Sequence, residues 1–133
     1  MYADTTQART AEELERFQGT WVQVTCQIDG VKDPPEVYGL HPRVTFSGRK
    51  YVVTRPDGAL AIRGHFKIDP MALPKSIDWT DTFGSDAGIT IPAIYFFEQD
   101  RFVFCAASAS HLRPCTFNGE VGHIVRIHER VKP

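Results

Sequence analysis

Short segments in which apolar and polar residues alternate run through the chain from Gly19 onward, and this pattern limits the fold more than any other feature. The alternation is clearest in residues 60–68, where one face is apolar and the other carries charged side chains. A period of two residues is typical of half-buried β-strands. Turn-forming sequences such as Asp29-Gly30 separate the segments. No helices alternate with them, which favours an all-β protein over an α/β protein.

The predicted strands are short and follow one another closely. We expect them at residues 21–28, 43–46, 50–54, 60–68, 75–80, 89–97, 101–107, 115–117 and 123–130. Residues 101–107 are apolar on both faces, and Pro92 predicts a bulge or a sheet edge within its strand. An open sheet of about eight or nine strands leaves unpaired edges, which closure removes. The sequence therefore predicts a single antiparallel β-barrel.

A short helix precedes the strands. Thr10 and Glu13 have the spacing of a capping box, and Leu14 and Phe17 lie on one helical face. A helix of this length is not stable alone, so we expect it to dock on one end of the barrel. We predict a flexible segment at residues 1–9 and one domain at residues 10–133.

Composition excludes several classes of protein. The formal net charge is −1, with 15 basic and 16 acidic residues in no long run, which argues against a nucleic-acid-binding protein. No apolar stretch is long enough to cross a membrane, and the polar start of the chain predicts a cytoplasmic protein. The three cysteines have no C-x-x-C spacing, so neither a disulfide framework nor a zinc site is expected.

Several motifs in the same order resemble those of a family of small bacterial lipocalin-like proteins of uncharacterised function, over residues 14–132. They are Gly19-Thr20-Trp21, Asp29-Gly30, Val44-Thr45-Phe46, Gly64-x-Phe66-x-Ile68-Asp69-Pro70, Pro74-Lys75-Ser76-Ile77-Asp78, Ile94-Tyr95, Cys105 and Arg113-Pro114-x-x-Phe117. The resemblance implies an up-and-down barrel whose lumen holds one small ligand. It also implies that Trp21 packs at the closed end beneath an arginine of the last strand, either Arg130 or Arg126. It implies no particular reaction.

An excess of aromatic residues departs from the family pattern. The residues concerned are Trp79, Phe83, Phe96, Phe97, Phe102 and Phe104. Such side chains suit an aromatic ligand, although they also serve to fill a small barrel. The first hypothesis is therefore a protein that binds a small apolar or aromatic molecule. The expected ligand-binding residues are Gln23, Tyr51, Trp79, Phe104, Cys105 and Arg113.

A second hypothesis is a cofactor-independent lyase, isomerase or cyclase with acid–base groups in the lumen. Its candidates are His65 or His123 as the base, Tyr95 as the proton donor and Asp78 to orient the base, with Arg113 to hold an anion. His65 lies opposite the apolar residues of its strand, which favours a solvated outer position. His123 points inward only if Val125 and Ile127 do. Arg113 is equally suited to pairing with a structural carboxylate.

The histidine spacing argues against a bound metal. His123 and His128 are five residues apart on one strand and face opposite sides, and no H-x-H or H-E-x-x-H motif occurs. We expect no cofactor. A haem held by a single histidine, His123, His111 or His65, is the alternative.

The first strand leaves a third hypothesis open. If Trp21 points inward, a regular strand places Gln23, Thr25 and Gln27 beside it in a polar wall. The apolar residues of segment 22–28 then form an outer row that needs a cover. A homodimer, or an interaction protein that uses this face, follows from that arrangement.

Overall fold

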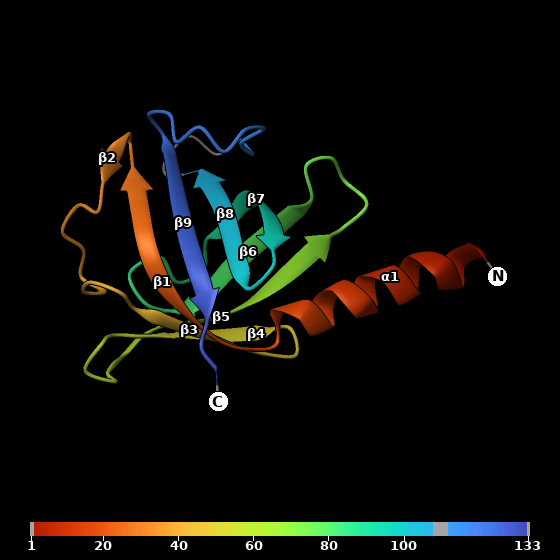
Figure 1. Cartoon of the computed structure of the whole chain (residues 1–133), viewed down its shortest axis with the longest axis horizontal. Coiled ribbons are helices and arrows are strands. Elements are labelled where there is room, and N and C mark those ends of the chain that lie inside the picture. Colours follow the sequence, from red (N-terminus) through yellow and green to blue (C-terminus); the bar gives the residue numbers. More distant parts are fainter. Residues whose placement is uncertain (1, 108–111, 133) are drawn as a thin grey trace.

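The computed structural model describes residues 2–107 and 112–132, and in these ranges it contains one helix and nine strands (Figure 1). The elements in chain order are α1 (Tyr2–Phe17), β1 (Gly19–Ile28), β2 (Val31–Lys32), β3 (Arg43–Ser47), β4 (Lys50–Thr54), β5 (Leu60–Asp69), β6 (Ser76–Phe83), β7 (Thr90–Glu98), β8 (Arg101–Ala107) and β9 (His123–Arg130). None of the helical structure in these ranges is long and apolar enough to cross a membrane.

The strands form one closed antiparallel barrel. From β3 to β9, each strand pairs with the next along the chain, and β1 pairs with both β3 and β9. Strands β1 and β3–β9 therefore close an eight-stranded barrel, and β2 extends the sheet beside β1. Closure leaves the eight barrel strands without a free edge. The predicted all-β barrel is confirmed.

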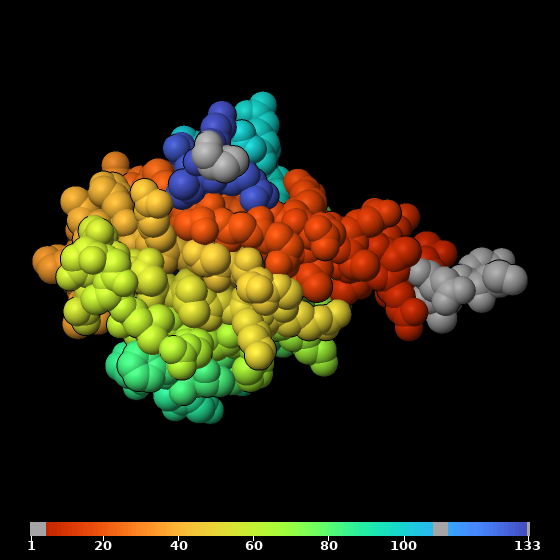
Figure 2. Space-filling model, turned by 90° about the horizontal axis from the view of Figure 1, so that it is seen from below, coloured from red at the N-terminus to blue at the C-terminus, as the bar shows by residue number. Residues whose placement is uncertain are grey.

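Two local predictions were wrong. The helix begins at Tyr2 rather than Thr10, and its N-terminal part extends beyond the barrel (Figures 1 and 2). Residues 115–117 form no strand and instead belong to an irregular segment that lies over the barrel wall. Of the bulge or sheet edge predicted at Pro92, the structure shows the edge, because β7 pairs with β8 only from Ala93 onward and the proline lies just outside that ladder.

The C-terminal end of α1 closes one end of the barrel. Phe17 is fully buried and packs against Phe46, Phe66 and Phe102 at ring-centroid distances of 5.1–5.4 Å. Its backbone carbonyl accepts a 2.8 Å hydrogen bond from the indole nitrogen of Trp21. Phe17 therefore acts as an aromatic plug that fixes where the lumen ends.

Arg130 is the arginine that lies over Trp21. Its guanidinium carbon is 4.1 Å from the indole centroid, a cation–π contact. The guanidinium also donates 2.7 Å hydrogen bonds to the carbonyls of Arg16 and Gln18 at the end of α1. This side chain therefore connects the last strand, the first strand and the helix.

A β-bulge changes which face of β1 is buried. The pairing of β1 with β9 shifts between Gln23 and Thr25, so Cys26 pairs with the inward-facing Arg126. The predicted inward position of Thr25 and Gln27 is therefore wrong, since both lie on the outer face beyond the bulge. The continuous apolar outer row that suggested a second subunit is not formed.

A second apolar cluster covers the outside of β7, β8 and β9. Its buried members are Ile94, Val103, Cys105 and Val125, with Phe96, Phe117 and Ile127 packed against them. The rings of Phe96 and Phe117 meet at 4.8 Å. This cluster explains why residues 101–107 are apolar on both faces.

Candidate ligand-binding cavity

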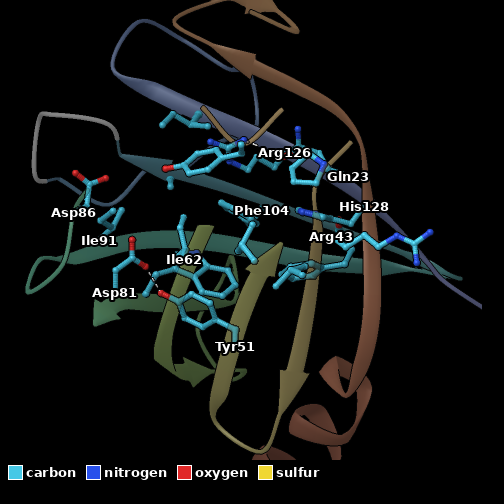
Figure 3. Close-up of a pocket in the computed structure, with 18 of the residues that line it drawn as sticks. Gln23, Arg43, Tyr51, Ile62, Asp81, Asp86, Ile91, Phe104, Arg126 and His128 are labelled. Atoms are coloured by element: carbon cyan, nitrogen blue, oxygen red, sulfur yellow. Dashed lines mark hydrogen bonds between the residues drawn. The ribbon is translucent and has the colours of Figure 1, made fainter. Parts of the chain in front are cut away.

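A cavity of about 170 Å³ occupies the barrel at the end opposite to α1 (Figure 3). Its apolar wall consists of Val44, Phe46, Val53, Ile62, Trp79, Ile91, Phe102, Phe104, Ala106 and Ile124. Phe46 and Phe102 touch the Phe17 plug and also line the cavity, so the plug supports the floor. An apolar cavity of about 150 Å³ is large enough for benzene. The lumen is therefore the size of a molecule with one ring.

A glycine brings two polar side chains of the wall together. Tyr51 on β4 pairs with Gly64 on β5, and Gly64 pairs with Asp81 on β6, so the three form one row across the sheet. A Cβ atom on Gly64 would collide with the phenol of Tyr51. Without that atom, the Tyr51 hydroxyl reaches across the row and donates a hydrogen bond to Oδ1 of Asp81.

Burial raises the pKa values of both members of this pair, while Asp81 stays the acceptor of the hydrogen bond from Tyr51. Asp81 is 7% exposed, and its pKa is raised by burial, with a further contribution from the nearby Asp86 carboxylate. Burial and the acceptor Asp81 raise the pKa of Tyr51. Tyr51 therefore remains a hydrogen-bond donor at neutral pH.

Arg126 on β9 extends into the lumen and is fully engaged there. It donates hydrogen bonds of 2.8 and 2.9 Å to the two carboxylate oxygens of Glu36, and a third of 2.9 Å to Oε1 of Gln23. Its guanidinium carbon also lies 5.6 Å from the ring centroid of Tyr38. Glu36 and Tyr38 belong to residues 33–42, which we term the strap. Arg126 thus fastens the strap to the barrel, and Glu36 neutralises its charge.

His128 is a buried, neutral histidine in the same wall. Its ring stacks on Phe104 at 5.8 Å, and Nδ1 lies 3.4 Å from the carbonyl oxygen of Phe102. Burial first, and the positive charge of Arg126 second, lower the pKa of His128 to about 3. The imidazole therefore carries no charge at neutral pH.

Trp79 contributes the largest apolar side chain of the cavity wall. Its ring meets that of Tyr51 nearly at right angles, with centroids 5.2 Å apart. Its indole nitrogen is buried and has no hydrogen-bond partner in the part of the chain that the structure describes. A buried donor without an acceptor is costly.

The structure separates the expected ligand-binding residues into two groups. Gln23, Tyr51, Trp79 and Phe104 line the cavity. Cys105 lies in the outer apolar cluster instead, where burial raises the pKa of its thiol to about 11.

Arg113 lies on the outside of the barrel. It donates a 2.7 Å hydrogen bond to the carboxylate of Asp78 and a 2.8 Å bond to the carbonyl of Ala93. Arg113 therefore pairs with a structural carboxylate, which is the second of the two roles that the sequence allowed.

The four residues assigned to acid–base chemistry are not brought together. His65 is exposed on the outer face of β5, and Asp78 is on the outer face of β6 beside Arg113. Tyr95 is buried near the plug, where its hydroxyl donates a 2.8 Å hydrogen bond to Glu13 of the helix. His123 shares the outer face of β9 with Val125, because Arg130 and every second residue before it face inward. Their proposed catalytic roles have no shared site to act in.

Two of the histidines considered for haem, His65 and His123, face away from the lumen, and His111 lies outside the described residues. Within residues 2–107 and 112–132, no group of three or more His, Cys, Asp or Glu side chains has an arrangement suited to a metal ion.

Sequence reasoning missed several lumen residues for identifiable reasons. The two-residue period of a strand places His128 and Arg126 on the same inner face as Arg130. The sequence nevertheless offered Arg126 only as an alternative partner of Trp21. Asp81 was missed because the predicted strand ended at residue 80, whereas β6 continues to Phe83. No sequence signal places Glu36 in the lumen, because its position depends on the path of the strap.

Comparison with known proteins gives limited similarity. No protein-family model matches the sequence, and no curated protein matches it. Two solved structures do match, both at 15% sequence identity and both covering 98% of this chain and 69% of theirs. They are apocrustacyanin C1, with a TM-score of 0.48, and apocrustacyanin C2, with a TM-score of 0.45. The class of this protein is therefore defined by its own strand pairing and cavity: a small closed antiparallel β-barrel with an internal cavity.

Proposed function

We propose that this barrel binds one small ring-containing molecule in its lumen. The observation that carries the proposal is the cavity of about 170 Å³ with a wall of aromatic and aliphatic side chains. Ligand sites are typically concave and mostly apolar, with a few polar groups that orient the ligand. Here Tyr51, Asp81 and Gln23 are the polar groups. Burial of an apolar ring in this space supplies the affinity.

The entrance supports the same function. The strap lies at the open end of the barrel, and a two-point ion pair from Glu36 to Arg126 holds it. The two side chains are only 11% and 14% exposed, so water screens the pair weakly. A fixed strap keeps the lumen formed in the absence of ligand, which reduces the ordering cost of binding.

Filling the cavity provides the direct test. Ile91 lines the lumen, whereas Ile89 is 54% exposed just before the same strand. We expect 2-phenylethanol to bind the unmodified protein in isothermal titration calorimetry, with no binding to Ile91→Trp and unchanged binding to Ile89→Trp. Equal binding to both variants would show that the molecule sits outside the lumen and would refute the proposal.

A further inference from the structure

The charged groups around the cavity are unevenly compensated. The charged residues that line it are Arg43, Asp81, Asp86 and Arg126. Arg126 is neutralised by Glu36, with both carboxylate oxygens within 2.9 Å of the guanidinium. Arg43 is exposed, and its guanidinium extends to the side of the cavity opposite Asp81 and Asp86 (Figure 3). Neither arginine therefore supplies a positive charge to the end where the two aspartates lie.

Asp81 and Asp86 have no ion-pair partner among the described residues. Asp81 uses Oδ1 to accept the hydrogen bond from Tyr51, and no described donor bonds to its other carboxylate oxygen. The Asp81 side chain is nonetheless almost fully buried at the cavity wall. A buried carboxylate without a cation is unfavourable, and a ligand cation would correct this.

Aromatic faces surround the same end of the lumen. Tyr51 meets Trp79 edge to face, and Trp79 meets Phe104 with ring centroids 5.0 Å apart. Tyr38 of the strap also lines the cavity, but its ring already contacts Arg126. Aromatic faces attract cations as well as other rings. Positive charge is thus favoured at this end by both the carboxylates and the rings.

We infer that the cavity selects ring compounds that carry a protonated amine, with the ammonium group near Asp81 and Asp86 and the ring against Trp79 and Phe104. The inference rests on the proposed function and specifies its ligand class. Neutral His128 and the compensated Arg126 offer no free positive charge to an anionic ligand, so a carboxylate on the same ring is disfavoured.

Three compounds of similar size and different charge test this selection. Phenethylamine, 2-phenylethanol and phenylacetate are titrated into the protein at pH 7 by calorimetry. A charge-assisted hydrogen bond is stronger than a neutral one, so we expect the amine to bind roughly tenfold more tightly than the alcohol. Phenylacetate is expected to bind most weakly. Equal or tighter binding of the alcohol or the acid would overturn the inference.

Matched variants assign the effect to the lumen carboxylates. Asp81→Asn keeps the shape of the side chain and removes its charge, and it is expected to weaken phenethylamine about tenfold while changing 2-phenylethanol less than about threefold. Asp100→Asn removes the same charge from an exposed turn and is expected to change neither. If Asp81→Asn does not fold, as judged by circular dichroism, Asp86→Asn at the exposed rim takes its place, with a loss of about threefold for the amine alone. Unchanged amine affinity in the folded variant would contradict the inference.

The outcomes separate the two proposals. If the alcohol binds as tightly as the amine and Ile91→Trp abolishes both, the lumen is a binding site and only the inference about the amine fails. If none of the three compounds binds to the unmodified protein, both proposals fail.

Discussion

Replacing Glu13 with glutamine tests how the helix is held on the barrel. The Glu13 side chain is 7% exposed, and Oε2 accepts hydrogen bonds of 2.8 Å from both Lys75 and Tyr95. Arg16 contributes a further ion pair at 3.3 Å. Glutamine preserves the size and one acceptor oxygen, so the change isolates the negative charge.

The expected loss follows from the exposure of the partners. A buried hydrogen bond to a charged group contributes about 1.5–3 kcal/mol. The Lys75 side chain is 34% exposed and that of Arg16 is 48% exposed, so solvent screens both ion pairs and the lower end applies. We expect Glu13→Gln to reduce the free energy of unfolding by about 1.5 kcal/mol, a fall of roughly 5 °C in melting temperature.

The pH dependence makes the prediction specific. Burial alone would raise the pKa of Glu13, but hydrogen bonds from Lys75 and Tyr95 hold it below its ordinary value of 4.5. A lowered pKa in the folded state stabilises the protein at pH above the ordinary value, and this contribution disappears as pH falls through the folded-state pKa. The difference between the unmodified protein and Glu13→Gln should therefore be full at pH 7 and shrink below about pH 4.5.

Urea denaturation followed by tryptophan fluorescence, repeated from pH 7 to pH 3, measures this difference. Glu12→Gln is the matched control, because Glu12 is the exposed neighbour on the same helix. It should change stability by less than about 0.5 kcal/mol at every pH. A loss in Glu13→Gln that did not depend on pH would show that the charge of Glu13 does not hold the helix in place.

Three other substitutions test the remaining contacts. Arg130→Ala removes the contact with Trp21 and two carbonyl hydrogen bonds. It should lower the free energy of unfolding, measured by urea denaturation, by about 2–3 kcal/mol. A loss under about 1 kcal/mol would contradict this. Glu36→Gln leaves Arg126 without its carboxylate partner. It should lower the free energy of unfolding by about 2–4 kcal/mol and speed amide hydrogen exchange in the strap. Unchanged exchange would show that the ion pair does not hold the strap. Gly64→Ala forces a Cβ atom against a tyrosine hydroxyl and should lower the free energy of unfolding by about 1–3 kcal/mol. An unchanged free energy of unfolding would contradict the close contact at this position.

The architecture could be predicted from the sequence because closure follows from alternation. Most barrel strands carry a two-residue pattern, and turn residues such as Asp29-Gly30 mark where strands end. The last strand was predicted with its observed bounds, His123–Arg130. Of the two arginines that the family resemblance offered for Trp21, the structure places Arg130 over the indole.

The side of each strand that faces inward was harder to predict, because a single irregularity reverses the pattern. The bulge after Gln23 turns Cys26 inward, although alternation from Trp21 predicts that it faces outward. Strand β8 has no polar face, so nothing in its sequence shows that Cys105 belongs to the outer cluster rather than the lumen. Both errors concern direction within correctly predicted strands.

The polar groups of the lumen depend on departures from regular strand geometry. The bulge in β1 places Cys26 and Gln23 next to each other on the inner face, so that Arg126 contacts both. On the opposite wall, the missing side chain at Gly64 is what allows Tyr51 to reach Asp81.

In a barrel of the same composition with regular strands, the contacts of Arg126 with Gln23 and Cys26, and of Tyr51 with Asp81, would not form. The polar groups available to orient a ligand therefore depend on two local features, a bulge and a glycine, that composition does not reveal. Both features also add polar groups to a wall that is otherwise apolar, and a polar group buried in such a wall is retained at a cost in stability. The carboxylate of Asp81 is the clearest case, because it lies almost fully buried at the cavity wall with one hydrogen bond from a described residue, that of Tyr51. A loss of stability from buried polar groups is expected in a site that binds a molecule. A wall that only fills a core gains nothing from it.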